Sequence, residues 1–281
     1  MVLFLNICLF IVFQLFDISS STYTFRDADS WSIEYPQCGT EHQSPIDIST
    51  DQIQPGKYEQ PFTIYNIDQP PNKFTLNNTG KGLKLTGEWD DDKIPTITGG
   101  PLIVDQYVFG CNEYYWSREN ISNSPHKVDG ESFALEVHAV YYKKNYGSHD
   151  IAKKYDDGIV IVVGVWEEWA YGEDTAISLI TLKLPEVVRP GAVADIRPFS
   201  FLELLEDPSD PPTNYYTYTG SVIKPPCTPA LYFIQNYIYP IKPHGMELFR
   251  AVQFENDDVS NVRPPQPLND RVVYELERRI G

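Results

Sequence analysis

The chain has 281 residues, of which 42% are hydrophobic and 14% aromatic, so it is long enough for one large domain or two small ones. Its formal net charge of −17 at pH 7 repels nucleic acid, anionic glycans and anionic membranes, and no basic patch offsets that charge. These partners are therefore excluded, and the excess acid favours solubility in an extracellular fluid over a specific cationic partner.

The chain begins with an apolar run from Met1 to Phe16, followed by the small polar stretch DISSST. Because the run is short and terminal for a membrane span, it predicts a secretory signal at residues 1–21 that is cleaved to leave a mature domain at residues 22–281. No further apolar run of spanning length follows, and the charged end RVVYELERRIG argues against a membrane or lipid anchor. We expect a secreted, extracellular protein.

Strand-like segments follow one another along the mature chain, rich in β-branched and aromatic residues and separated by Gly, Pro, Asn and Asp. The predicted strands are FTIYN (62–66), FTLNN (74–78), GLKLTG (82–87), QYVFGCNEYYW (106–116), FALEVHAVYYKK (133–144), IVIVVGVW (159–166) and ALYFIQNYIYPI (230–241). Short helical patterns occur at EDTAISLITLKLPE (173–186), FSFLELLED (199–207) and HGMELFRAV (244–252). The run Ile159 to Val163 is apolar on both faces, which predicts a central strand. The predicted fold class is mainly β, with a few short surface helices.

Four cysteines bear on the redox compartment, and one of them, Cys8, is lost with the signal. The remaining cysteines are Cys38, Cys111 and Cys227. In an oxidising compartment three cysteines make one bridge and leave one thiol. Two sequons, at Asn77 and Asn120, predict glycosylation of a secreted surface.

Five separated stretches resemble, in order and spacing, the signature segments of the α-class carbonic anhydrases. They are CGTEHQSPIDI (38–48), NTGK (78–81), SPHKVDGESFALEVHAVYY (124–142), YTYTGSVIKPPC (216–227) and NVRPPQPLNDRVV (261–273). The resemblance implies a single domain with a central, mostly antiparallel, ten-stranded sheet and a conical cleft that ends at a zinc ion. It also implies a disulfide between Cys38 and Cys227, the pairing common in secreted members.

Members of that family hold zinc with three neutral imidazoles, which keep the ion electron-poor enough to bring the pKa of its bound water near 7. The segment Glu136-Val137-His138 resembles the strand that carries the third histidine, with Glu136 as the carboxylate that orients His138. The upstream His-x-His-Trp strand aligns through Trp116 and places Glu113 and Tyr115 at the two other ligand positions. Residues i and i+2 share a face of a strand, so the geometry is kept while the ligand types are not.

Tyrosine is a poor zinc ligand at neutral pH because its phenol must first lose a proton with a pKa of about 10. Glutamate can ligate zinc, but its charge makes bound water less acidic. By the same resemblance, Ile223 replaces the threonine that accepts a hydrogen bond from zinc-bound hydroxide, and Pro125 replaces the glutamate behind it. Lys81 replaces the proton-shuttling histidine, and its pKa near 10.4 does not suit that task at pH 7.

Structural roles compete with functional ones at several of these positions. His138 is interpreted as a core histidine held by Glu136, the alternative being a metal ligand. Glu113 and Tyr115 are interpreted as filling the space of an absent ion, the alternative being a redesigned metal site. The residues expected to hold the fold are Gln43, Ser44, Asn261 and Arg263. Cys111 is expected to be a small buried residue.

The sequence therefore predicts a secreted carbonic-anhydrase-related protein that has lost the hydratase site, binds no cofactor and acts by binding an extracellular partner that the sequence does not identify. Lys81 and Lys224 are expected to line the cleft mouth and to favour a small anion there, the alternative being that both lysines point into solvent. The runner-up is a zinc-dependent carbonate dehydratase with His138 and Glu113 as surviving ligands. A storage or venom-like protein without a specific ligand is the third alternative.

Overall fold

A computed structural model describes residues 23–119, 123–170, 175–205, 207, 209 and 211–280. The predicted signal at residues 1–21 and the sequon residue Asn120 lie outside the described residues.

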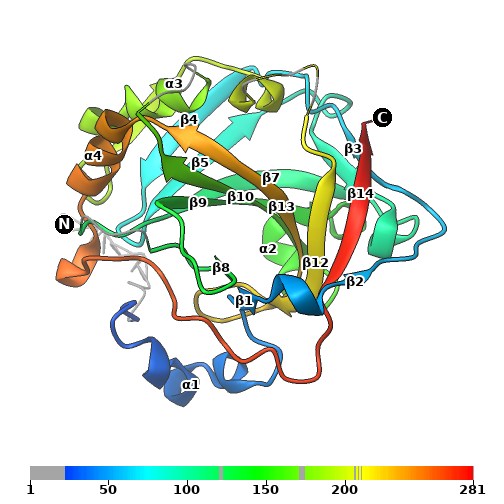
Figure 1. Ribbon diagram of the computed structural model, residues 1–281. Coiled ribbons are helices and arrows are strands. Elements are labelled where there is room, and N and C mark those ends of the chain that lie inside the picture. The colour runs from blue at the N-terminus through cyan, green and yellow to red at the C-terminus, as the bar shows by residue number, and fades with distance from the viewer. Residues whose placement is uncertain are drawn as a thin grey trace, which may run out of the picture.

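One twelve-stranded sheet dominates the fold (Figure 1). Its strands are β2 (Gln54–Pro55), β3 (Phe62–Tyr65), β4 (Lys73–Asn78), β5 (Leu83–Glu88), β6 (Thr96–Thr98), β7 (Tyr107–Tyr115), β9 (Leu135–Lys143), β10 (Ile159–Glu168), β11 (Val193–Ile196), β12 (Asn214–Ser221), β13 (Pro229–Ile241) and β14 (Tyr274–Ile280). A separate two-stranded sheet joins β1 (Asp47–Ile48) to β8 (Lys127–Val128) in parallel. The predicted strands are confirmed in all seven ranges.

The large sheet is mostly antiparallel, and only the pairs β10–β13, β14–β3 and β14–β2 are parallel. The family resemblance implied ten strands, and the sheet has twelve. The count of twelve includes segments as short as the two-residue β2. Strand β10 lies between β9 and β13, so the prediction of a central strand at 159–163 is confirmed. Its two covered faces explain why that run carries no polar residue.

The sheet also closes on itself and gives the core a barrel-like form. Neighbours run in the order β11-β4-β5-β7-β6-β3-β14-β12-β13-β10-β9, and a further pairing of β9 with β7 completes a ring from β7 through β6 and β14 back to β9. Strand β7 makes this possible because it is long: its first residues pair with β6 and its last with β5. Side chains of the ring strands, including Phe62, Tyr141 and Phe233, pack together in its interior.

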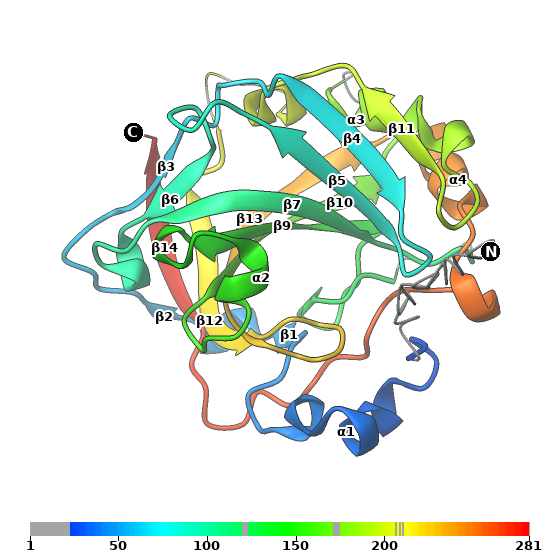
Figure 2. The ribbon, with the colours of Figure 1, turned by 180° about the vertical axis from the view of Figure 1, so that it is seen from behind.

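Helices are short and lie outside the sheet. They are α1 (Trp31–Glu34), α2 (His149–Ala152), α3 (Ile177–Thr181) and α4 (Pro243–Ala251), with 3₁₀ turns at Ala28–Ser30, Pro36–Gly39, Thr50–Gln52, Gly100–Leu102, Lys144–Tyr146, Leu184–Glu186, Phe201–Leu204 and Glu255–Asp257. The helix predicted at 244–252 is confirmed as α4, whereas 199–207 forms only a 3₁₀ turn among its described residues. Figures 1 and 2 show α3 and α4 together at one end of the sheet and α2 on the side seen from behind.

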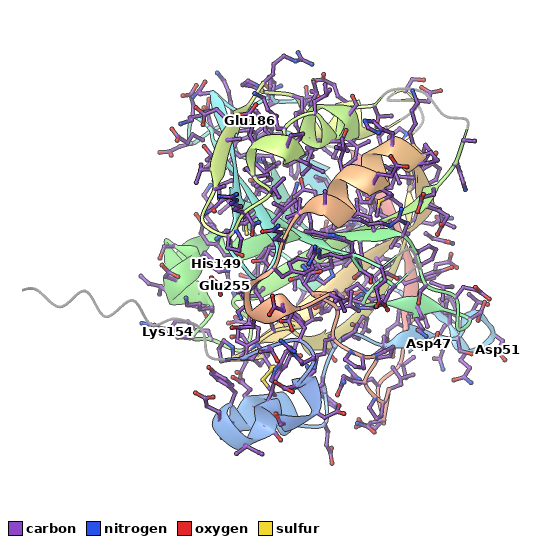
Figure 3. All side chains as sticks on the ribbon, turned by 90° about the vertical axis from the view of Figure 1, so that its left-hand side faces the viewer. Asp47, Asp51, His149, Lys154, Glu186 and Glu255 are labelled. Carbon is purple, nitrogen blue, oxygen red and sulfur yellow. A yellow bond between two sulfur atoms is a disulfide. The ribbon has the colours of Figure 1, made fainter. Side chains whose placement is uncertain are left out.

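A disulfide ties the N-terminal segment to the sheet. Cys38 and Cys227 form the bond that the family resemblance implied, and both side chains are buried beside Phe25 and Trp31. No helix among the described residues is long and apolar enough to cross a membrane. Charged side chains project from the periphery, where Figure 3 labels Asp51, Lys154 and Glu186.

Candidate functional site

Strands β7 and β9 bring the three predicted ligand positions together. Antiparallel pairing places Glu113 opposite His138 and Tyr115 opposite Glu136, and the two-residue period of each strand turns all four side chains to one face of the sheet. The ring centroids of Tyr115 and His138 lie 4.6 Å apart. The four side chains that the sequence singled out are therefore neighbours in space, although they come from two strands that are separate in sequence.

Glu113 is bonded through both of its carboxylate oxygens. The ammonium group of Lys224 donates to Oε1 over 2.6 Å, and the hydroxyl of Tyr115 donates to Oε2 over 2.8 Å. Glu113 thus accepts one hydrogen bond from Tyr115 of its own strand and one from the distant Lys224. The sequence predicted Lys224 at the cleft mouth, but its ammonium group contacts the carboxylate of Glu113.

Charges in this cluster shift one another's pKa values. Burial alone would raise the pKa of Glu113, but the charge and the hydrogen bond of Lys224 outweigh it and lower that pKa to about 2. Burial would lower the pKa of Lys224, but the charge of Glu113 raises it above its usual value. Burial and then the charge of Glu113 raise the pKa of the Tyr115 phenol well above 10. The cluster at neutral pH is thus a carboxylate, an ammonium and a neutral phenol.

Behind His138 lies a second cluster, in which the sequence predicted the contact of Glu136 with His138 but not the contacts of His126 and Tyr218. Oε1 of Glu136 lies 2.5 Å from Nε2 of His138 and 2.6 Å from Nδ1 of His126, while its Oε2 accepts from the His126 backbone. The other ring nitrogen of His126 contacts the Tyr218 hydroxyl at 2.7 Å, and Tyr218 contacts Ser44 at 2.8 Å. The predicted role of Glu136 in holding His138 is confirmed.

The Glu136 carboxylate remains ionised in spite of its burial. Burial acts to raise its pKa, but the charges and hydrogen bonds of His126 and then His138 lower it to about 2. Burial lowers the pKa of His138, an effect larger than the opposing influence of Glu136. Alternation in the segment 216–220 was the signal that could have placed Tyr218 on this face of the sheet. His126 lies in a short loop-like segment whose pattern carried no such signal.

Metal-ligand atoms gather in this second cluster. One ligand atom each of His126, Glu136 and His138 lies within 4.8 Å of the others, and all three residues are buried. This is the group of described residues that could hold a metal ion.

An open pocket of about 290 Å³ lies beside Glu113 and Tyr115, and Tyr23, Lys81, Lys84 and Lys224 line it. Lys81 donates to the backbone carbonyl of Tyr23 over 2.7 Å, and its ammonium lies 5.0 Å from the centre of the Tyr23 ring. Lys81 and Lys224 therefore do not both point into solvent. Lys84, which sequence reasoning missed, stands opposite Glu113 in the pairing of β5 with β7.

The remaining predicted positions have ordinary structural surroundings. Ile223 is fully buried among apolar side chains, and Pro125 is buried next to His126. Cys111 is buried and free of disulfides, and burial raises its pKa to about 12. Asn77 lies half-buried in β4, between β5 and β11. Glycosylation of Asn77 stays a prediction.

The polar residues expected to hold the fold make buried hydrogen bonds to the backbone and to one another. Arg263 donates to Oε1 of Gln43 and to the Ser44 and Cys38 carbonyls over 2.8 to 2.9 Å. The Asn261 side chain donates to the Tyr114 carbonyl and accepts from the Trp116 backbone. These bonds confirm a structural role.

Comparison with known proteins identifies the family. Residues 26–277 match the eukaryotic-type carbonic anhydrase family. The chain is 27% identical to mouse carbonic anhydrase 6 over 249 residues, which are 86% of this chain and 76% of that protein. It is 26% identical to human carbonic anhydrase 6 over 267 residues, 91% of this chain and 83% of that protein. It is 30% identical to mouse carbonic anhydrase 7 over 254 residues, 87% of this chain and 92% of that protein. With its barrel-like sheet, this chain belongs to the eukaryotic-type carbonic anhydrase family.

Proposed function

We propose that this chain is a secreted carbonic-anhydrase-related protein that does not hydrate carbon dioxide and acts by binding a partner. The observation that carries the proposal is the bonding of Glu113, whose two oxygens accept from Lys224 and Tyr115. By the family resemblance, Glu113 and Tyr115 stand where two zinc-binding imidazoles are expected. The ammonium group of Lys224 therefore lies close to the position where the family holds its zinc ion.

The donors at these positions do not fit a catalytic zinc ion. Such an ion takes neutral imidazoles, and His138 supplies the one imidazole at the three positions. The raised pKa of Tyr115 keeps the phenol protonated and unable to act as an anionic ligand. The ammonium of Lys224 repels a dication at the carboxylate that would have to bind it.

The buried group of His126, Glu136 and His138 does not fit zinc either. Tetrahedral ligands at zinc bond lengths lie about 3.3 Å from one another. Oε1 of Glu136 is only 2.5 and 2.6 Å from the two histidine nitrogens, which are hydrogen-bonding distances. A metal would have to break both of these bonds in a cluster that is at most 1% exposed. We therefore propose that the mature protein has no zinc cofactor.

Metal content and activity test this proposal together. We expect the mature protein, dialysed against metal-free buffer, to retain well under one zinc ion per chain by mass spectrometry. We also expect no acceleration of carbon dioxide hydration over buffer in stopped-flow measurements. Stoichiometric zinc together with sulfonamide-sensitive hydration would refute it. That result would establish the alternative, a carbonate dehydratase with a degenerate site, which family membership and the retention of His138 favour.

The proposal places the mature chain, residues 22–281, outside the cell. It is supported by the apolar start of the sequence and by the Cys38–Cys227 disulfide, since such bonds persist in oxidising compartments. N-terminal sequencing of protein recovered from culture medium would locate the cleavage site. A mass shift on enzymatic removal of N-glycans, compared among Asn77→Gln, Asn120→Gln and the unaltered chain, would show which sequons are used.

The cleft pocket is the proposed binding surface. Three lysines, Lys81, Lys84 and Lys224, line the pocket. Glu113 pairs with Lys224, and Glu255 lies 3.8 Å from the Lys81 ammonium, so one positive charge is left over on an acidic protein. Lys84 forms no ion pair with the described residues. A small carboxylate, or an acidic side chain of a partner, suits this pocket. We expect acetate to shift the NMR signals of pocket residues in the unaltered protein and less so in Lys81→Ala/Lys84→Ala; equal responses would refute the pocket as the binding surface.

A further inference from the structure

A second cavity lies on the opposite face of the same strands. Its volume is about 90 Å³, and its walls come from ring strands and from the 3₁₀ turn at Phe201–Leu204. Asn112 lines it from β7, one residue before Glu113, and Val137 and Ala139 line it from β9, on either side of His138. Because side chains alternate across a sheet, this cavity and the cleft are separated by the sheet itself.

Among the described residues, Arg278 is the one charged side chain that lines this cavity. It is 3% exposed, and neither Nε nor Nη2 has a hydrogen-bond partner in the part of the chain that the structure describes. No ion pair joins it to another described residue, and its guanidinium lies 5.8 Å from the centre of the Tyr215 ring. A buried guanidinium without an anion is strongly unfavourable, since its loss of hydration is left uncompensated.

The other polar groups at the cavity do not neutralise Arg278. Tyr141 and Tyr215 line the same space, and burial raises the pKa of both phenols, so they remain uncharged. Tyr215 accepts a hydrogen bond from Gln235 over 3.0 Å, which leaves its own O–H to donate. Asn112 is 4% exposed, and its Oδ1 has no partner. The cavity therefore offers unused donors on Arg278 and Tyr215, one unused acceptor on Asn112, one full positive charge and apolar walls.

We propose that this cavity binds a short-chain carboxylate, with the carboxylate on the guanidinium of Arg278 and the alkyl chain among the apolar side chains of the ring interior. Guanidinium and carboxylate match in shape as well as charge, because two parallel N–H groups meet two oxygens. Walls that include Ile64, Val162 and Leu204 exclude a strongly hydrated anion. The site is independent of the cleft and of its proposed loss of zinc.

Cavity volume sets the size of the ligand. A cavity of roughly 150 Å³ holds the six carbons of benzene, so about 90 Å³ holds about four non-hydrogen atoms. The four carbons of butanoate supply these, while its two oxygens lie against the guanidinium of Arg278. Butanoate is therefore the probe of choice. Acetate leaves apolar space unfilled, and octanoate exceeds the cavity, so both should bind more weakly than butanoate.

Calorimetric titration of the mature protein tests the proposal. We expect one tight, saturable butanoate site per chain at this cavity, with any binding at the cleft lysines weaker, and at least tenfold weaker binding of butan-1-ol, which keeps the chain and lacks the charge. Arg278→Met should weaken butanoate binding at least tenfold, whereas the matched change Arg197→Met, at an exposed arginine, should leave it unchanged. Lys81→Ala/Lys84→Ala should also leave it unchanged, which separates this cavity from the cleft.

Two further measurements keep the test decisive if Arg278→Met does not fold. Butanoate should raise the unfolding temperature of the unaltered protein by mass action, and butan-1-ol should do so less. Ala139→Leu, which places a larger side chain on the cavity wall and keeps Arg278, should abolish the rise. Absence of saturable butanoate binding, equal affinity for butan-1-ol, or unchanged affinity in a folded Arg278→Met would overturn the proposal.

Discussion

The ammonium nitrogen of Lys224 lies 2.6 Å from Oε1 of Glu113, and the two residues are 111 positions apart in sequence. The contact joins the segment that follows β12 to the last part of β7, so it is a tertiary link as well as a charge pair. With side chains only 29% and 15% exposed, the two charges are only partly screened by water.

Removal of this ammonium should destabilise the fold. In Lys224→Met, Glu113 keeps its bond to Tyr115 but loses its counter-charge. We expect the free energy of unfolding to fall by about 2 to 4 kcal/mol, since an uncompensated, largely buried carboxylate remains. Urea unfolding near neutral pH measures the change.

A double-mutant cycle provides the control. Lys224→Met/Glu113→Gln removes both charges, so its loss of stability should be smaller than the sum of the two single losses. Additive losses would show that the pair is not coupled and that Lys224 acts through packing alone.

Acid should unfold the protein through the buried carboxylates. The folded-state pKa values of Glu113 and Glu136 are lowered to about 2, so the stability they contribute is full above their ordinary value of 4.5 and is lost as the pH falls toward 2. The lowered pKa of His138 adds a loss that begins near its ordinary value of 6.5, because the unfolded chain takes up the proton first. Urea midpoints measured across this range should fall steadily with acidification.

Glu113→Gln should flatten the curve of urea midpoint against pH below 4.5, the ordinary pKa of a glutamate, because one of the titrating carboxylates is gone. The exposed change Glu41→Gln is the matched control and should leave the shape of the curve unchanged. A curve with the same acid slope in Glu113→Gln would assign the effect to other groups.

Restoring a metal site should require the removal of Lys224. Glu113→His/Tyr115→His supplies two imidazoles beside His138, but the ammonium that paired with Glu113 then has no counter-charge next to the metal. We expect Glu113→His/Tyr115→His/Lys224→Thr to bind zinc at least tenfold more tightly than Glu113→His/Tyr115→His does. Competition with a chelating dye measures both affinities. Turnover should remain low until Pro125→Glu and Ile223→Thr are added, since ligands and orienting groups act as a unit. Equal zinc affinity of the two variants would show that Lys224 does not oppose the ion.

The disulfide should contribute strongly to stability. Cys38 and Cys227 are 189 positions apart, and closing a loop of this length stabilises the fold by roughly 4 to 5 kcal/mol in the chain-entropy model. We expect Cys38→Ala/Cys227→Ala to show most of this loss in urea unfolding. Peptide mapping without reductant should recover the Cys38–Cys227 pair. A disulfide peptide that contains Cys111 would contradict the pairing.

Periodicity and motif order carried most of the fold prediction. The alternation in 133–144 and the two-sided apolar run at 159–163 predicted β9 and the central β10 correctly, because burial on one face or both leaves a direct trace in the sequence. The family resemblance, which rests on the order of the motifs, also implied the Cys38–Cys227 disulfide. Edge and closing strands such as β6 and β11 were missed, since they are short and their pairing depends on distant segments.

The site was predicted in part. Alternation placed Glu113 and Tyr115 on one face, and the Glu-x-His pattern placed Glu136 beside His138. No local pattern could show that Lys224 reaches Glu113, because the direction of a long side chain is set by the tertiary fold. Arg278 was missed for the same reason: in sequence it is one charge in a charged terminal segment, and its burial becomes visible only in three dimensions.

The alternation of β7 and β9 across the sheet has an evolutionary consequence. Substitutions at 113, 115 and 138 alter one compartment, while 112, 137 and 139 belong to the other, so selection can act on the two sets separately. A duplicated enzyme gene could exchange its catalytic side chains one by one while the residues that determine folding stayed under purifying selection. Relaxed constraint on the cleft and sustained constraint on the ring interior would then leave different substitution rates at alternate positions of the same two strands.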